Sequence, residues 1–311
     1  MNNDSAPSLV LVKTALDKLF DEATIEMAVV GKATALDSQV FTQDTASNAA
    51  VVSSVIGGGG YFQTTTDDVA TTNEANVFGA SPKTTLVVQF KKNLPISRTF
   101  MADQQQSAVS KAVKQQALTW GASRDRNAFG VYANGFVTTS TTTIDGVALF
   151  SNSHVNQHGD TVDNLETGAL TDSNLNIVIN SLRTQLSQTG VILGYEPKWL
   201  LTPSILHQTG MTVAKSVLRA GTGNNDLNYF SEMYPGMKVV YSPFLDGTSA
   251  TAYFVGSSTH GVSRFEREGF FTVLRPWEES SNDQYMYKMR AREAVDAIEY
   301  SGLVGSTGAT A

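Results

Sequence analysis

The chain has 311 residues, a formal net charge of -7 and no cysteine. Its length suffices for one large domain or two ordinary ones. The lack of cysteine excludes disulfide staples, thiolate zinc sites and cysteine nucleophiles. The basic residues form no clustered stripe of the kind that a sequence-reading nucleic-acid binder carries. The 63 Ser and Thr residues outnumber the 51 charged ones, which fits a β-rich protein and extensive packing between subunits equally well.

Residues 1–50 are predicted to form an N-terminal arm. Between Leu9 and Met27 apolar residues recur at helical spacing, and this period predicts an amphipathic helix that docks on its own subunit or on a neighbour.

Met1 to Ala6 is polar and acidic, so no secretory signal is visible. No apolar run approaches the roughly 18 residues that a bilayer span needs. We therefore expect a protein that is made in the cytoplasm and does not enter a membrane.

Residues 51–95 are predicted to form an extended hairpin behind a flexible hinge. Four consecutive glycines, Gly57 to Gly60, have almost no conformational preference. They also lack the Lys and Ser/Thr spacing of a phosphate-binding loop. The segments Tyr61 to Thr66 and Thr84 to Phe90 have strand composition and are expected to pair with each other. Because an isolated hairpin is marginal in water, we expect this one to lie against a neighbouring subunit.

Residues 103–134 are predicted to form one long helix. Asp103 is a plausible N-cap and Asn134-Gly135 a natural stop. Between them one set of residues recurs mostly at three- and four-residue steps, the period of an amphipathic helix: Val109, Ala112, Val113, Gln116, Ala117, Trp120, Phe129 and Tyr132. A helix of this length spans about 48 Å, longer than a compact domain of this size needs. It suits a spine in a flat assembly that several subunits share.

Residues 171–258 are predicted to form an α/β sub-domain inserted into the main fold. A short strand is expected before it, at Ile144 to Phe150. One helix is expected to begin at Thr171 or Asp172 and to end at Gly190, and another covers Pro203 to Arg219. The predicted strands of the sub-domain are Pro197 to Leu201, Met237 to Pro243 and Ala252 to Gly256.

The chain is predicted to return to the strands of the main fold after this insertion. Phe270 to Leu274 and Gln284 to Ala294 have strand patterns, and the second alternates in polarity. Arg290, Arg292 and Glu293 on this strand are interpreted as an exposed charge ladder. Residues 305–311 are expected to be a flexible tail.

His154 and His158 are the candidates for a metal site, and a metal-binding enzyme is one alternative function. Two histidines four residues apart could bind a metal ion with Asp160 if they lay on a helix. Gly159 favours a polar loop instead, and Val155 stands where zinc proteases carry glutamate. No Gly-x-Ser-x-Gly elbow is present. The sequence therefore assigns no catalytic, cofactor-binding or metal-binding residue.

Four short stretches, in this order and spacing, resemble the Mu-like phage major head subunit family. They are Leu149-Phe150-Ser151-Asn152-Ser153-His154, Gly194-Tyr195-Glu196-Pro197-Lys198-Trp199-Leu200-Leu201-Thr202-Pro203, Val240-Tyr241-Ser242-Pro243-Phe244-Leu245 and Met289-Arg290-Ala291-Arg292-Glu293-Ala294. The order of arm, hairpin, long helix, inserted sub-domain and returning strands is similar to that of tailed-phage major capsid proteins. The resemblance implies an α+β chain with the Hong Kong 97-type capsid fold.

The resemblance also implies a function and assigns each part of the chain to a domain of the capsid fold. The protein would be a major capsid protein that assembles through pentamers and hexamers into an icosahedral shell around phage DNA. Residues 51–95 would be the extended loop, 96–170 and 259–304 the peripheral domain, and 171–258 the axial domain at the five- and six-fold axes. Relatives with a cleaved scaffold segment are longer before the hinge, so a separate scaffold or protease is expected, with portal and decoration proteins as further partners.

Subunit contacts are expected from glycines, aromatic residues and cations of the hairpin, the long helix and the last long strand. These candidates are Gly57, Gly60, Tyr61, Phe62, Phe78, Phe90, Lys91, Lys92, Trp120, Arg290 and Arg292. With a net charge of -7 the shell is expected to enclose double-stranded DNA without sequence-specific binding. An encapsulin-like compartment that houses a cargo protein is the alternative on the same fold.

Overall fold

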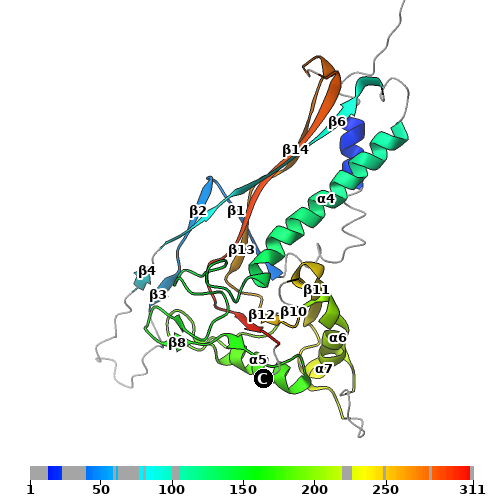
Figure 1. Cartoon of the computed structure of the whole chain (residues 1–311). Helices are drawn as coiled ribbons and strands as arrows, with labels where there is room; N and C mark the ends of the chain where they lie inside the picture. Colours follow the sequence, from blue (N-terminus) through cyan, green and yellow to red (C-terminus); the bar gives the residue numbers. More distant parts are fainter. Residues whose placement is uncertain are drawn as a thin grey trace, which may run out of the picture.

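The computed structural model describes residues 13–22, 40–58, 61, 77–79, 82–99, 106–218, 226–247, 250–279 and 282–308. Two β-sheets and one long helix organise these residues (Figure 1). A long, narrow sheet with the helix beside it extends away from a broader body that holds the second sheet. Among the described helices, none is both long and apolar enough to cross a membrane.

The long sheet has four strands in the order β1-β13-β14-β6. The bounds are Thr42–Thr45 for β1, Val262–Arg275 for β13, Gln284–Ala297 for β14 and Val88–Ser97 for β6. β13, β14 and β6 are antiparallel, while β1 runs parallel to β13. Burial alternates along β14, where Tyr287, Met289 and Ala291 are buried and the residues between them are half-buried. This alternation confirms the predicted strand and shows that one face of the sheet is covered.

Two helices cover that face of the long sheet. α4 (Gln106–Ala133) runs beside the sheet, and residues 13–22 form a short helix near its far end (Figure 1). Val113 and Ala117 of α4 pack with Leu16 and Phe20 of the short helix against apolar residues of the strands. The predicted long helix is therefore confirmed over 106–133, while residues 103–105 lie outside the described part of the chain.

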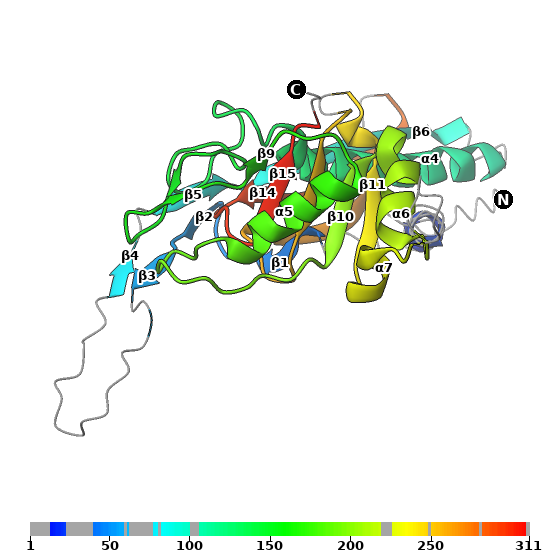
Figure 2. The same cartoon turned by 90° about the horizontal axis from the view of Figure 1, so that it is seen from below.

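The second sheet has five strands in the order β11-β10-β12-β15-β9. Their bounds are Lys238–Ser242, Trp199–Pro203, Tyr253–Gly256, Leu303–Ser306 and Leu165–Glu166. Viewed from below, α5 (Asp172–Thr184) crosses one face, and α6 (His207–Lys215) and α7 (Tyr229–Met233) lie beside β11 (Figure 2). The described residues also include three single-turn 3-10 helices: η1 (Ser204–Leu206), η2 (Pro243–Leu245) and η3 (Trp277–Glu279).

A shared aromatic core joins the body to the base of the long sheet. Tyr132, near the end of α4, lies 5.9 Å from Trp199 of β10 and 5.5 Å from Phe254 of β12, measured between ring centroids. Its hydroxyl donates a 2.8 Å hydrogen bond to the carbonyl oxygen of Val40. All of these side chains are buried. The C-terminal end of α4 is therefore fixed in the body, while its N-terminal half follows the long sheet.

The predicted hairpin pairs differently from the expectation. β2 (Ala50–Ser53) pairs with β5 (Lys83–Leu86), and β3 (Ile56–Gly58) pairs with β4 (Val77–Gly79). The expected pairing of Thr84 to Phe90 with Tyr61 to Thr66 is thus wrong, because the apolar run before the glycines supplies the partner strand. Gly57 and Gly58 belong to β3 instead of a loop, and residues 59–60 and 62–76 lie outside the described part.

Several expected boundaries also change. Residues 305–308 are not a flexible tail: Gly305 and Ser306 are buried in β15, which pairs with β12. α5 begins after its predicted cap Thr171 but ends at Thr184 instead of Gly190. The expected strand at 144–150 is a turn region with one isolated bridge, Thr142 to Ala148. After this turn region, β7 (His154–Val155) and β8 (Thr161–Val162) form a short antiparallel pair.

Candidate assembly surfaces

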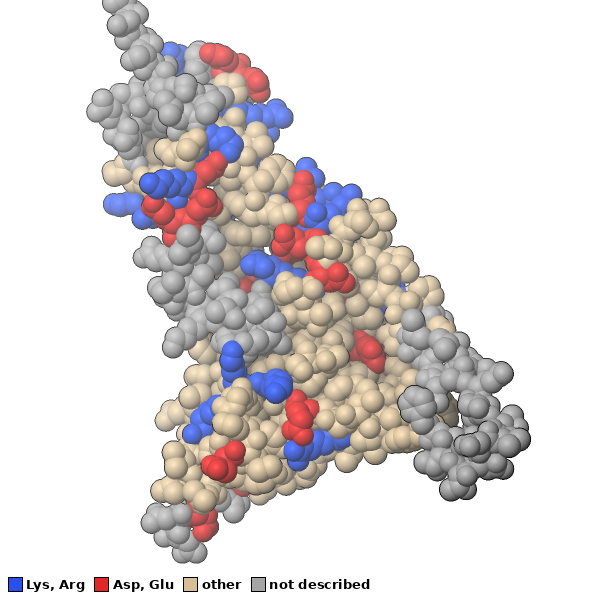
Figure 3. Space-filling view, turned by 180° about the vertical axis from the view of Figure 1, so that it is seen from behind, with Lys and Arg blue, Asp and Glu red and all other residues tan. Residues whose placement is uncertain are grey.

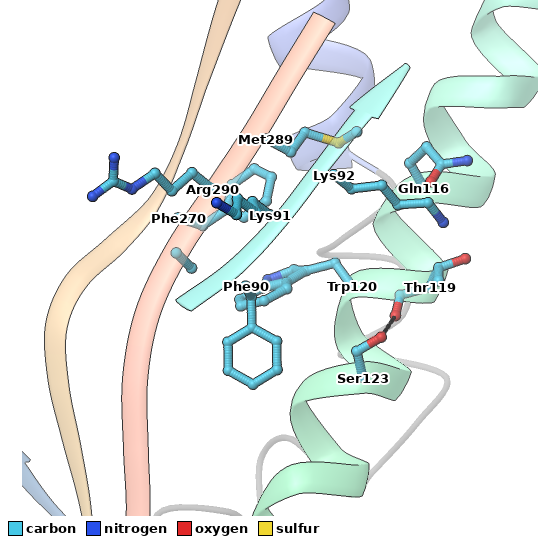
Figure 4. Close-up of a pocket in the computed structure, with 11 residues that line it drawn as sticks. Phe90, Lys91, Lys92, Gln116, Thr119, Trp120, Ser123, Phe270, Met289 and Arg290 are labelled. Carbon is cyan, nitrogen blue, oxygen red and sulfur yellow. Dashed lines mark hydrogen bonds between the residues drawn. The ribbon is translucent and has the colours of Figure 1, made fainter. Parts of the chain in front are cut away.

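Phe90, Trp120 and Phe270 line a hollow between α4 and the long sheet (Figure 4). The rings of Phe90 and Trp120 meet edge to face with centroids 5.5 Å apart, and those of Trp120 and Phe270 are 5.3 Å apart. Trp120 therefore bridges strands β6 and β13 from the helix. Two of the predicted interface residues, Phe90 and Trp120, thus come together, although each is only partly exposed.

Lys92 and Gln116 lie at the rim of the same hollow. Phe90 and Lys92 are two residues apart on β6, so they point to the same face of the sheet. Figure 4 shows the Lys92 side chain running toward α4, next to Gln116. The Oε1 atom of Gln116 is buried and has no hydrogen-bond partner among the described residues. Leaving such an acceptor unsatisfied costs about 1–3 kcal/mol.

Lys91 and Arg290 face the other side of the sheet. They lie directly opposite each other on β6 and β14, and Figure 4 shows Arg290 pointing away from α4. Like charges in this position repel. Glu268 offsets the repulsion because its carboxylate lies 3.1 Å from the Arg290 guanidinium. Arg292 occupies the next position on the same face of β14.

Glu293 does not belong to an exposed charge ladder, so that interpretation is wrong. Its side chain is 4% exposed and forms an ion pair with the buried guanidinium of Arg264 on β13. Arg124 of α4 lies 3.5 Å from the same carboxylate oxygen. A bulge in β13 between its pairs at 266 and 268 breaks the regular alternation here. This buried cluster was not predicted, because Arg264 lies outside the strand that was expected at 270–274.

The hairpin candidates are only partly described. Gly57 and Phe78 are partners in the β3–β4 ribbon, whereas Gly60 and Phe62 lie outside the described residues. Tyr61 is largely exposed, and its hydroxyl accepts a 3.1 Å hydrogen bond from the amide of Ile192. The hairpin is therefore tied, just beyond β3, to the loop that follows α5.

His154 and His158 do not face a common centre. The Nδ1 atom of the buried His154 lies 2.7 Å from Asp145, and its Nε2 atom lies 3.2 Å from the carbonyl oxygen of Leu149. Burial alone would raise the pKa of Asp145, but hydrogen bonds from His154 and other neighbours lower it. His158 is exposed and lies 3.1 Å from Asp160. Within the described ranges no cluster of His, Asp or Glu is placed to hold a metal ion.

Asp17 fastens the short N-terminal helix to the long sheet. The Tyr287 hydroxyl donates a 2.7 Å hydrogen bond to it, and Thr272 and Lys13 also donate to its carboxylate. Burial alone would raise the pKa of Asp17, but these hydrogen bonds hold it below the ordinary value of 3.8. Beside this contact the rings of Phe20 and Phe270 stack at 4.4 Å. The sequence predicted the helix but not this anchor.

Large apolar side chains remain exposed in several places. Val52 and Leu86 of the hairpin are 65% and 71% exposed, and Val217 after α6 is 73% exposed. Figure 3 shows acidic and basic groups interspersed along the narrow upper part, with broad uncharged areas over the body. Exposed apolar side chains next to uncharged surface are typical of interaction surfaces.

Comparison with known proteins identifies related capsids. A family model described as phage capsid protein matches residues 80–306. Among curated proteins no match was found. A solved structure from Microbacterium phage Oxtober96 superposes with a TM-score of 0.53 at 13% identity, covering 87% of this chain and 90% of that chain.

Two further solved structures share the fold. The procapsid of bacteriophage JBD30 gives a TM-score of 0.51 at 14% identity, covering 96% of this chain and 75% of that one. A virus-like particle from Pyrococcus furiosus gives 0.52 at 9% identity, with 93% and 98% covered. These likenesses confirm the predicted Hong Kong 97-type fold, while the narrower Mu-like family stays a prediction.

Proposed function

Because the chain belongs to the phage capsid protein family, we propose that its copies assemble through pentamers and hexamers into an icosahedral shell around phage DNA. The observation that carries the proposal is the extent of the family match, which includes α4 and most of both sheets. The chain is accordingly a major capsid shell protein and a component of the virion. We propose that its role is structural, with assembly taking place in the host cytoplasm.

The arrangement of the sheets and helices supports an assignment of parts of the chain to the domains of a capsid subunit. Residues 96–170 and 259–304, which include α4, β13 and β14, would form the peripheral domain, residues 171–258 the axial domain, and residues 51–95 the extended loop. The open face of the long sheet and the exposed Val52 and Leu86 support contacts between copies. The similar structures from JBD30 and Pyrococcus furiosus are a procapsid and a virus-like particle, which supports assembly into a closed shell. A separate scaffold or protease, a portal and a decoration protein remain proposed partners.

The test is the size of the purified particle. The chain is expressed alone and together with its neighbouring genes, and each sample is analysed by sedimentation and negative-stain imaging. We expect hollow shells, or rings of five and six, in at least one sample. Monomers alone in both samples, at every concentration, would contradict the proposal.

The particle contents separate a phage head from a protein compartment. Particles isolated with the neighbouring genes are treated with nuclease and then opened, and nucleic acid and protein inside are measured. Protected double-stranded DNA is the expected result. A single protected protein without DNA would instead indicate an encapsulin-like compartment on the same fold.

A further inference from the structure

We propose that Lys83 is the residue that sets the direction in which the hairpin leaves the subunit. The hairpin consists here of β2 and β5 with their continuation, β3 and β4, which lie away from α5 and α6 (Figure 2). The proposal rests on the proposed function only where it concerns assembly, because the direction of the hairpin is a property of the free subunit.

The hairpin joins the long sheet through two interruptions. Its strands continue β1 and β6, the two edge strands of that sheet (Figure 1). Residues 46–49 separate β1 from β2, and the single residue Val87 separates β5 from β6. The amide of Val87 donates a 3.0 Å hydrogen bond to the carbonyl oxygen of Ala49. Because both strands leave the ladder of the long sheet here, that ladder alone does not fix the direction of the hairpin.

The apolar cluster at this junction is small. Its buried residues are Ala46, Phe265 and Ala294, and the side chains packed against them with partial exposure include Val51 and Val87. Burial of apolar surface is a non-directional force. The cluster therefore holds the hairpin against the sheet without fixing the angle between them.

Lys83 supplies directional contacts across the same junction. Its ammonium nitrogen lies 2.7 Å from a carboxylate oxygen of Asp296 and 2.7 Å from the carbonyl oxygen of Ala297, both at the end of β14. The carbonyl oxygen of Thr142, in the turn region after α4, is the third acceptor. Each of the three N–H groups of the lysine thus has an acceptor. Because hydrogen bonds weaken steeply when they are bent, these three fix the ammonium group in one place.

The carboxylate of Asp296 is bound a second time from the same strand. Thr85 lies two residues after Lys83, on the same face of β5, and donates a 2.6 Å hydrogen bond to the other carboxylate oxygen. The side chains of Lys83 and Asp296 are only 16% and 20% exposed, so solvent screens their attraction only in part. Strand β5 therefore cannot turn relative to β14 without breaking several of these bonds.

A fixed direction favours assembly because a contact surface that is ordered in advance costs less conformational entropy on binding. The outward face of the hairpin carries the exposed side chains of Val52 and Leu86. The contacts of Lys83 present this face at a defined place before a second copy arrives. Since Lys83 is mostly buried in its own subunit and acts through the hairpin, it is a positioning residue.

The test measures the direction of the hairpin in the free full chain by double electron–electron resonance, at a concentration where sedimentation shows single subunits. The chain has no cysteine, so Gly79→Cys in β4 and Ile177→Cys in α5 provide the only two spin-label sites. A side chain built at Gly79 meets no atom within 4 Å, and Ile177 is 51% exposed. A single narrow distribution of distances is expected.

The double variant Lys83→Met/Asp296→Asn removes these contacts without leaving a buried charge unpaired. The distance distribution should become at least about twofold wider, while circular dichroism shows that the body stays folded. Particle formation by this variant should be slower than that of the wild type. Thr85→Val, which removes one hydrogen bond and no charge, should widen the distribution less, and it decides the test if the double variant does not fold.

Two controls separate this role from other effects. Lys111→Met makes the same change at an exposed lysine of α4 and should leave the width unchanged. Tyr61→Phe removes the hydrogen bond to the amide of Ile192 and should widen the distribution less than the double variant does.

Three results would overturn the proposal: an unchanged width in both Lys83→Met/Asp296→Asn and Thr85→Val, an equal widening in Lys111→Met, and a widening in Tyr61→Phe as large as in the double variant. The last result would place the control of direction at Tyr61. Particle formation by the wild type is measured separately, so a failure of the proposed shell function is not confused with a failure of this proposal.

Discussion

The body around β10, β12 and β15 and the long sheet around β6 and β13 differ in how completely they are covered. Every residue of those three body strands is buried. Along β6, only Ile96 is fully buried, and burial in β13 is confined to its base and to Leu274. The body therefore closes its own core, whereas the long sheet is covered on one face by α4 and a short helix.

This difference indicates where the chain depends on other molecules. A closed apolar core stabilises the body without a partner. The long sheet instead has an open face, and most residues of β6 are exposed or half-buried. We infer that the body folds by itself and that contacts with other chains complete the long sheet.

The largest effect is expected from breaking the core of the body. Phe254 is buried, and its ring lies 5.0 Å from that of Phe150. Phe254→Ala should lower the free energy of unfolding by about 4 kcal/mol, because it leaves a cavity that the packed rings cannot fill. Urea denaturation followed by circular dichroism measures the change. A loss below about 1 kcal/mol would show that this core is not the main source of stability.

A slightly smaller effect is expected where the long sheet is joined to α4. Glu293→Gln would leave the buried guanidinium of Arg264 without its carboxylate, at a cost of about 3 kcal/mol. Glu268→Gln is the control, because Glu268 forms a partly exposed pair with Arg290 and should cost less than about 1 kcal/mol. Equal losses in the two variants, measured by denaturation, would refute a special role for the buried cluster.

The docked N-terminal helix should respond to pH. The pKa of Asp17 is lowered in the folded protein. The contribution of the Asp17 contact to the free energy of unfolding is therefore complete above the unfolded pKa and is lost as the pH falls through the folded pKa. Asp17→Asn should therefore cost about 1–2 kcal/mol at neutral pH and progressively less in acid. Glu22→Gln, at an exposed position, is the control. The same cost for Asp17→Asn at pH 7 and well below the ordinary carboxyl pKa would contradict this contact.

The smallest effect on the isolated subunit is expected at the open face. Lys91→Gln removes a like charge opposite Arg290, so the free energy of unfolding should change by no more than about 0.5 kcal/mol, in the stabilising direction. Thermal unfolding at low and at high salt tests this, because screening should reduce the difference. A large destabilisation would mean that Lys91 has a structural partner in the subunit.

Helices and strands with a clear period were predictable, and pairings that depend on distant residues were not. The apolar steps around Val113 and Ala117 predicted α4, and the alternation around Tyr287 predicted β14. The partner of β5 was missed because the two paired strands of the hairpin were assigned to 61–66 and 84–90, whereas Val51 and Val52 precede the glycines. β15 was missed because Gly305 and Ser306 resemble a tail locally, although Val304 beside them is buried in the sheet.

The candidate surfaces show the same limit. Phe90, Lys92 and Trp120 were predicted as contact residues from their type and position, and the fold brings them to one hollow. Its spacing placed Gln116 on the same helix face as Trp120, whereas Arg126 could not be predicted to join them, because it looks like an ordinary polar residue of a helix. The buried pair of Arg264 and Glu293 depends on a bulge in β13, which no local pattern in the sequence marks.

Hydrogen–deuterium exchange on the free subunit and on the assembled particle tests the contrast between the two regions most directly. The amides of β10, β12 and β15 are predicted to exchange slowly in both states. Those of β6 and of the outer half of β13 are predicted to exchange quickly in the free subunit and about tenfold or more slowly in the particle. If β6 is already as protected in the free subunit as in the particle, the long sheet does not depend on other chains, and the account is wrong.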